Sequence, residues 1–97
     1  MRKVDIVVRI ADEIGLTQVQ AEKAVNAILE EIKGGLERGE PVILRRFGSF
    51  QVREKRARTG RNPKTGEAAG IPARRVVRFK PGEHFRESVN DASYAQR

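Results

Sequence analysis

Residues 53–78 form a basic segment that limits what the rest of the chain can fold into. Its nine Lys and Arg residues stand among few large apolar ones. A segment with so little apolar surface cannot offset the entropy of ordering it inside a core. Without it, roughly 70 residues remain, a size at which one core is marginal and oligomerisation often supplies the missing burial. We therefore expect a small body that holds this segment out toward a partner.

Positive charge is concentrated in the same part of the sequence. Residues 45–80 contain twelve Lys and Arg against two Glu, a balance of +10, whereas the remainder holds eight against eleven Asp and Glu, a balance of −3. Such asymmetry predicts a polyanionic partner. Nucleic acid is favoured over an anionic membrane surface, because the segment lacks the apolar helical stripe of a membrane anchor.

The residue types within the segment favour duplex over single-stranded nucleic acid. Seven of the nine cations in residues 53–78 are Arg, which suits phosphate forks and narrow minor grooves. The segment also lacks the aromatic residues on which single-strand binders stack bases.

The inventory of reactive residues argues against an enzyme. The chain has no Cys and a single His, His84, and its carboxylates are scattered along helix faces. These residues provide no nucleophile, no acid–base pair and no metal-ligand spacing. We expect no catalysis, no cofactor, no metal and no small-molecule substrate. No apolar run reaches the length of a signal sequence or membrane span, so we expect a cytosolic protein without a membrane partner.

The first 40 residues predict a helical hairpin. A first helix ends at Gly15, and a second begins at Thr17, where Gln20 completes a capping box, and ends at Gly39. Gly34 and Gly35 are expected to let the last turn fray or bend, or to admit another backbone closely. The apolar stripe is too wide for this chain to bury by itself, so we expect a partner subunit to cover it. The stripe comprises Val4, Val7, Ile10, Ala11, Ile14, Ala21, Val25, Ile28, Leu29, Ile32 and Leu36.

The remainder predicts a small antiparallel sheet and a last helix, and hence an α+β fold. Phe47–Phe50 is expected to form a tight corner between two strands, with Phe47, Phe50 and Val52 in the core. Phe85 and Val89 lie four residues apart on the expected inner face of the last helix. We expect one domain over 1–97, with a helical dimerisation body at 1–40, a sheet at 41–55 and 74–80, an arm within 53–78 and a C-terminal helix at 83–92.

The centre of the basic segment predicts a long hairpin. Asn62-Pro63-Lys64-Thr65 fits a type I turn, and Gly66 suits the left-handed position that follows it. Legs 53–62 and 67–78 would each reach about 33 Å at roughly 3.3 Å per residue. A lone two-stranded hairpin is marginally stable in water, so we expect an arm that is mobile when free and ordered when bound.

Four motifs give the chain a family resemblance. They are Phe47–Phe50 (FGSF), Arg58–Gly66 (RTGRNPKTG), Ala73–Val77 (ARRVV) and Phe79–Gly82 (FKPG). From about residue 3 to residue 92 the chain resembles the bacterial HU and integration host factor family, with a pattern closest to the alpha subunit of integration host factor. The tip string is the most specific of the four, because no common unrelated fold requires it.

The resemblance implies an intertwined dimer, with an identical or a related second subunit, whose arms reach around double-stranded DNA. The tip proline, Pro63 here, would wedge between base pairs from the minor groove and bend the duplex, a mechanism known from this family itself. It also implies roles in nucleoid organisation, recombination, replication and transcription regulation. The implied DNA-binding residues are Lys3, Arg46, Ser49, Arg53, Lys55, Arg56, Arg58, Arg61, Asn62, Pro63, Lys64, Arg74, Arg75, Arg78 and Lys80.

The chain departs from the family pattern in three places. Arg46 stands where the family usually has Gly, which adds charge beneath the DNA. Ala69 replaces the usual Ile before Gly70, which predicts a looser arm, and Glu83-His84 replaces basic residues, which predicts shorter wrapping. Two other functions stay open: a protein that coats DNA without bending it, and an RNA-binding protein.

Overall fold

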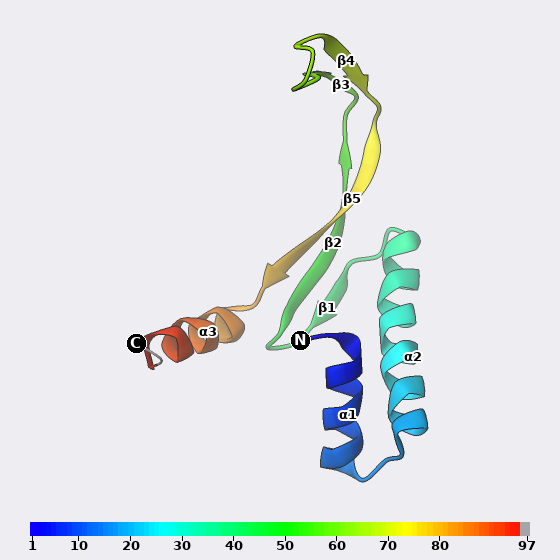
Figure 1. Ribbon diagram of the computed structural model, residues 1–97, viewed down its shortest axis with the longest axis vertical. Coiled ribbons are helices and arrows are strands. Elements are labelled where there is room, and N and C mark those ends of the chain that lie inside the picture. Colours follow the sequence, from blue (N-terminus) through cyan, green and yellow to red (C-terminus); the bar gives the residue numbers. More distant parts are fainter. Residues whose placement is uncertain (96–97) are drawn as a thin grey trace.

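The structure is a computed structural model that describes residues 1–95; residues 96–97 lie outside the described part. Two helices are followed by an antiparallel sheet that extends into a ribbon arm, and a last helix closes the chain (Figure 1). The α+β class is therefore as predicted. The elements are α1 (Lys3–Ile14), α2 (Gln18–Glu37), β1 (Val42–Leu44), β2 (Gly48–Lys55), β3 (Arg58–Arg61), β4 (Ala68–Ile71), β5 (Arg74–Pro81) and α3 (Glu83–Ala95).

The helical hairpin is capped as the sequence predicts. Thr17 Oγ1 accepts the N–H of Gln20 at 3.1 Å, and Gln20 Oε1 accepts the N–H of Thr17 at 3.0 Å, which is a reciprocal capping box. Gly15 ends α1 in the left-handed conformation, at φ 69°. The two helices enclose the core cluster of Val7, Ala11, Ala21 and Val25, with Ile10 and Leu16 packed against it.

The two glycines near the end of α2 do not interrupt the helix, which continues to Glu37. A Cβ on Gly35 would lie 3.3 Å from Val42 Cγ2, so the close approach of another segment is the role that the structure gives this glycine. At the end of α2 the N–H of Gly39 donates to Leu36 O and that of Glu40 to Gly35 O, both at 2.9 Å. With Gly39 at φ 80°, this is a Schellman motif.

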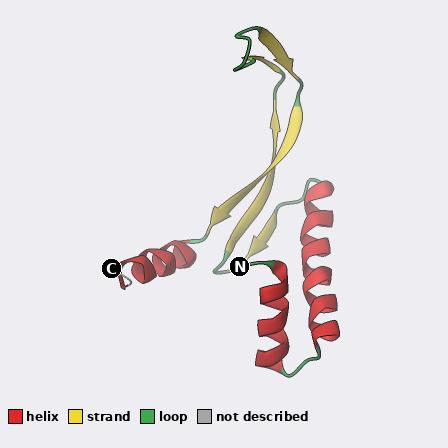
Figure 2. Ribbon diagram, viewed as in Figure 1, coloured by secondary structure: helices red, strands yellow, loops and turns green. Residues whose placement is uncertain are grey.

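The strands form two separate ladders rather than the one long hairpin predicted. β1, β2 and β5 make a three-stranded antiparallel sheet, and β3 pairs with β4 beyond it (Figure 2). The ladder of β2 and β5 ends at Lys55 opposite Arg74, and that of β3 and β4 starts at Arg58 opposite Ile71. Pro72 lies in the gap, and its ring nitrogen has no N–H to donate to a ladder.

The corner before β2 differs from the prediction. Residues 45–47 form the turn, closed by a hydrogen bond of 3.0 Å from the N–H of Phe47 to Leu44 O. Gly48 is already paired, with Leu44 on one side and Pro81 on the other. A Cβ on Gly48 would come within 2.6 Å of Lys80 O and 2.7 Å of Phe79 Cζ, so only glycine fits there.

The C-terminal half packs through its four phenylalanines. Phe79 lies 4.8 Å from Phe50 and 5.5 Å from Phe47 between ring centroids, and Phe85 of α3 lies 5.0 Å from Phe47. The expectation of a buried Phe47 is wrong for the single chain, where 44% of the residue is exposed. Phe50 and Val52 are half-buried. The last helix runs to Ala95, three residues beyond the predicted 83–92.

Much of the predicted apolar stripe is uncovered in one chain. The accessible surface is 8499 Å², whereas a compact protein of this mass exposes about 5,600 Å². The radius of gyration is 18.9 Å, against about 13 Å for a compact domain of 100 residues. The arm explains part of this excess, and exposed apolar side chains explain another part. They include Val4, Ile14, Ile28, Leu29, Val77 and Val89.

Candidate nucleic-acid interface

The outer part of the basic segment, residues 56–73, stands clear of the body. β3, β4 and the turn between them project away from α1 and α2 (Figure 1). No residue from 53 to 78 is buried, and only Gly60, Ile71 and Val76 are half-buried. The segment therefore makes little core, as its composition predicts.

The arm tip is a hydrogen-bonded turn that presents a proline. Asn62 Oδ1 accepts the N–H of Lys64 at 2.9 Å, and Asn62 O accepts the N–H of Gly66 at 2.8 Å. Gly66 has φ 73°, the left-handed conformation predicted for it. Pro63 is exposed at the far end of the turn, and as a proline it has no N–H that would need a partner.

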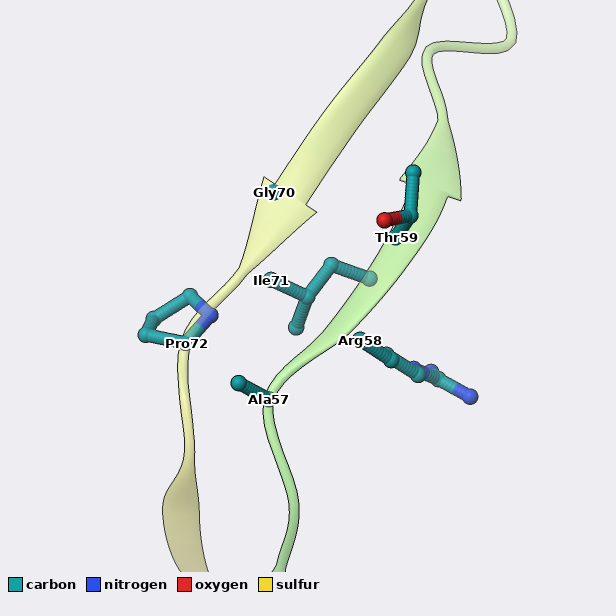
Figure 3. A pocket seen from close by; sticks show the side chains of 6 residues that line it. All are labelled: Ala57, Arg58, Thr59, Gly70, Ile71 and Pro72. Atoms are coloured by element: carbon teal, nitrogen blue, oxygen red, sulfur yellow. The ribbon is translucent and has the colours of Figure 1, made fainter.

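Ile71 links the two legs of the outer arm. Its side chain lies between the strands, whereas Arg58 points away from them (Figure 3). A Cβ on Gly60 would come within 2.7 Å of Ile71 Cδ1, so this glycine makes room for the isoleucine. The β3–β4 ladder continues across Ala69 and Gly70, where Gly60 lies opposite Ala69 and Thr59 lies opposite Gly70. A small open hollow at this level is lined by Ala57, Arg58, Thr59, Gly70, Ile71 and Pro72.

Most of the predicted cations of the arm are exposed and uncompensated. The salt bridges within the described part of the chain are Lys33–Glu37 and Arg38–Glu40, both outside the arm. Lys55 and Arg74 face each other across the ladder, and like charges at such a pair repel, so a bound anion would relieve them. The exposed cations other than Arg75 are Arg53, Lys55, Arg56, Arg58, Arg61, Lys64, Arg74 and Arg78.

Arg75 differs from its neighbours. Its Nη1 donates to Glu37 O and its Nη2 to Leu36 O, both at 3.2 Å. The guanidinium is therefore directed at the end of α2.

A second group of cations lines a hollow on the body. The hollow lies between the turn after β1, the end of β5 and the start of α3. Arg46, Ser49 and Lys80, which the family resemblance implies as DNA-binding residues, lie there, together with Arg45 and Arg86, which the resemblance did not indicate. Adjacency to Arg46 was the available signal for Arg45, whereas no local pattern marks Arg86. The charged lining of the hollow is Arg45, Arg46, Lys80, Glu83 and Arg86.

Lys3 lies on α1, where its Nζ donates to Asn26 Oδ1 at 2.9 Å.

Arg46 is held in a strained backbone conformation. Among the described residues it is the one non-glycine with positive φ, at 69°. It occupies the third position of the turn at 44–47, where type II turns take Gly. The left-handed conformation costs a residue with a Cβ roughly 1–2 kcal/mol.

Arg46→Gly should therefore raise stability and weaken binding to nucleic acid at the same time. We expect the free energy of unfolding to rise by up to about 1 kcal/mol, because relief of strain exceeds the added freedom of the unfolded chain. The slope of log binding constant against log salt should fall by about one. Urea unfolding and salt titrations measure the two effects. Arg45→Ala, which removes a charge from the same turn without relieving strain, is the control. A less stable Arg46→Gly protein would contradict the strain account.

Other kinds of site find no support in residues 1–95. No group of three or more potential metal ligands converges among them. None of the helices in that range combines the length and apolarity needed to cross a bilayer.

An exposed basic ribbon with a proline at its tip, on a small helical body, is the arrangement of an architectural DNA-binding protein. A protein-family model described as "Bacterial DNA-binding protein" matches residues 1–90. The chain belongs to this family, which includes HU and integration host factor and consists of DNA-binding proteins rather than enzymes.

Some of the similar proteins are integration host factor subunits, and others are HU proteins. Integration host factor subunit alpha of Halorhodospira halophila is 47% identical over 95 residues, which cover 98% of this chain and 92% of the relative. DNA-binding protein HU-1 of Halalkalibacterium halodurans is also 47% identical, over 90 residues that cover 93% of this chain and 100% of the relative. The structure of Anabaena HU in a cocrystal with DNA aligns with a TM-score of 0.85 at 45% identity, covering 92% of this chain and 97% of that one.

Proposed function

We propose that this protein binds double-stranded DNA as a dimer and bends it by inserting Pro63 between base pairs from the minor groove. The observation that carries the proposal is the exposed proline at the end of an arm whose cations lack ion-pair partners within the described chain. The Anabaena HU structure, solved with DNA, supports the choice of ligand.

The energetics of the tip and the legs favour a bent complex. Unstacking a base step costs a few kcal/mol, which contacts along a bent duplex offset. Arm cations that bind phosphate release counterions and so strengthen binding. The rigid ring of Pro63 can enter a base step with little loss of conformational entropy. In this proposal, Arg61, Asn62 and Lys64 contact sugar, phosphate and groove edges beside the wedge. Leg residues Arg53, Lys55, Arg56, Arg58, Arg74 and Arg78 contact phosphate, as do body residues Lys3, Arg45, Arg46, Ser49, Lys80 and Arg86.

An uncovered groove supports the dimer. The groove lies between α2 and the β2–β5 sheet, and its floor is almost entirely apolar. A second copy of the chain, or a related subunit, would bury this face and add the core that one chain lacks. The apolar lining residues are Leu29, Ile32, Leu36, Phe50, Val52, Val76 and Val77.

Such a protein would act where bent DNA is needed. We place it on the bacterial nucleoid in the cytoplasm, with roles in DNA condensation, recombination, replication and transcription regulation.

Energy transfer between dyes on the two ends of a short duplex tests the proposal. Saturating protein should shorten the end-to-end distance, and a duplex that stays straight when fully bound would mean a coating protein instead. Competition between duplex DNA, duplex RNA and single strands at fixed salt tests the ligand. Equal or tighter binding to RNA would overturn the DNA assignment.

Arg58→Ala should remove one phosphate contact. Because Arg58 points away from the ladder (Figure 3) and has no ion pair among the described residues, its loss should leave the fold intact. We expect the slope of log binding constant against log salt to fall by about one, similarly on every sequence. Arg38→Ala, outside the arm, is the matched control. An unchanged slope would mean that Arg58 does not reach the backbone.

A further inference from the structure

The end of α2 has a backbone carbonyl group for which the chain that follows the helix provides no N–H donor. The last carbonyls of an α-helix lack partners within the helix. Here the N–H groups of Gly39 and Glu40 reach Leu36 O and Gly35 O. In a continuing helix, Glu37 O would accept from residue 41, but that residue is Pro41, which has no N–H. The helix therefore ends on an acceptor that needs a donor from elsewhere.

Arg75 supplies that donor from β5. Its guanidinium reaches Glu37 O through Nη1 and Leu36 O through Nη2, each at 3.2 Å. The planar fork of Arg can serve two neighbouring acceptors, and its charge is favourable at the negative end of a helix dipole.

This link lies where the body passes into the arm. Arg75 pairs with Glu54, and the ladder ends one pair later, at Lys55 and Arg74. Beyond that pair the strands are interrupted before the outer ladder starts at Arg58. An arm joined to the body through two strands alone could swing about its base. The bonds from Arg75 add a second attachment, to a residue 38 positions away in sequence.

We propose that Arg75 is a positioning residue: it fixes the direction of the arm by binding the end of α2, and it does not contact DNA phosphate. Arg74, its neighbour, has no hydrogen bond to α2 among the described residues and remains free for phosphate. The inference rests on the proposed function, because the direction of the arm matters only if the arm holds DNA.

Arg75→Ala, compared with Arg74→Ala, tests this division of roles. Arg74→Ala should lower the salt slope of binding by about one, whereas Arg75→Ala should leave the slope unchanged. Without DNA, Arg75→Ala should speed hydrogen exchange at the amides of Gly39 and Glu40 by about tenfold, because two charge-assisted bonds at the helix end are lost. With saturating protein, it should also reduce energy transfer between the ends of a bound duplex.

Two further variants separate positioning from charge and from general stability. Arg75→Lys keeps the charge but not the planar fork, so it should share the loss of bending. Val7→Ala weakens the core between α1 and α2 and should leave the bend unchanged while the protein is folded.

Three results would overturn the inference. A salt slope reduced by one in Arg75→Ala would mean a phosphate contact. Wild-type bending in Arg75→Ala, or in Arg75→Lys, would mean that the bonds do not set the direction of the arm. Unchanged exchange at Gly39 and Glu40 would mean that the link to α2 does not form. Because exchange is measured without DNA, it still tests the link if the wild-type protein fails to bend DNA and the proposed function is wrong.

Discussion

Pro63→Ala should leave the protein folded and remove most of the DNA bend. Pro63 is exposed at the arm tip, so we expect stability to change by no more than about 1 kcal/mol. An alanine methyl group offers less rigid apolar surface to a base step and adds an N–H that the wedge would bury without a partner. The bound duplex should therefore relax most of the way to its free end-to-end distance. Energy transfer between the duplex ends at saturating protein measures this.

The control for this variant is Val19→Ala, which removes exposed apolar side-chain surface from α2 instead of from the arm tip. It should bend DNA as the wild type does. If Pro63→Ala also bends fully bound DNA as the wild type does, then Pro63 only forms the turn and the wedge is wrong. Circular dichroism and urea unfolding establish that both variants are folded before the comparison is made.

Leu29→Glu should dissociate the dimer and unfold the protein. In the single chain, Leu29 is 48% exposed, and a glutamate on an exposed helix face would change stability by about 0.5 kcal/mol or less. In the proposed dimer the same carboxylate is buried in the apolar groove, which costs several kcal/mol. The buried hydrophobic side chains of one chain are few, so loss of the partner should also cause loss of the fold. Sedimentation measures dissociation of the dimer, and circular dichroism measures loss of the fold. DNA binding should be lost as well.

Val19→Glu is the matched control on the same helix. Val19 is 65% exposed and does not line the groove, so its replacement should preserve mass, fold and DNA binding. A Leu29→Glu protein with the mass and stability of the wild type would show that no subunit covers the groove. Mixing the wild-type chain with a candidate second subunit, followed by mass measurement, separates identical from related partners.

Local signals in the sequence predicted local structure well. The capping box of Thr17 and Gln20 needs only residues three apart, and both of its hydrogen bonds are present. The tip turn with Gly66 in the left-handed conformation is equally local. Such features depend on dihedral preferences and short-range hydrogen bonds, which a single sequence carries in full.

Features that depend on packing were predicted less well. The long hairpin divides into two ladders near Pro72, although the charge pattern is continuous through the gap. Phe47 was expected in the core, but its cover in one chain is incomplete. Its neighbours come from β5 and α3. The spacing of apolar residues in the sequence does not predict the exposed fraction that these neighbours leave.

The sequence by itself determined the class of ligand and the turn at the tip of the arm. A charge balance of +10 over residues 45–80, together with a proline-centred turn, is sufficient for a basic hairpin that binds a polyanion. Tertiary structure decided which cations are free to do so. Arg74 and Arg75 are identical neighbours in sequence, yet only Arg75 reaches the carbonyls at the end of α2. That difference arises because alternate residues of a strand point to opposite faces, and only the fold decides which face meets the helix.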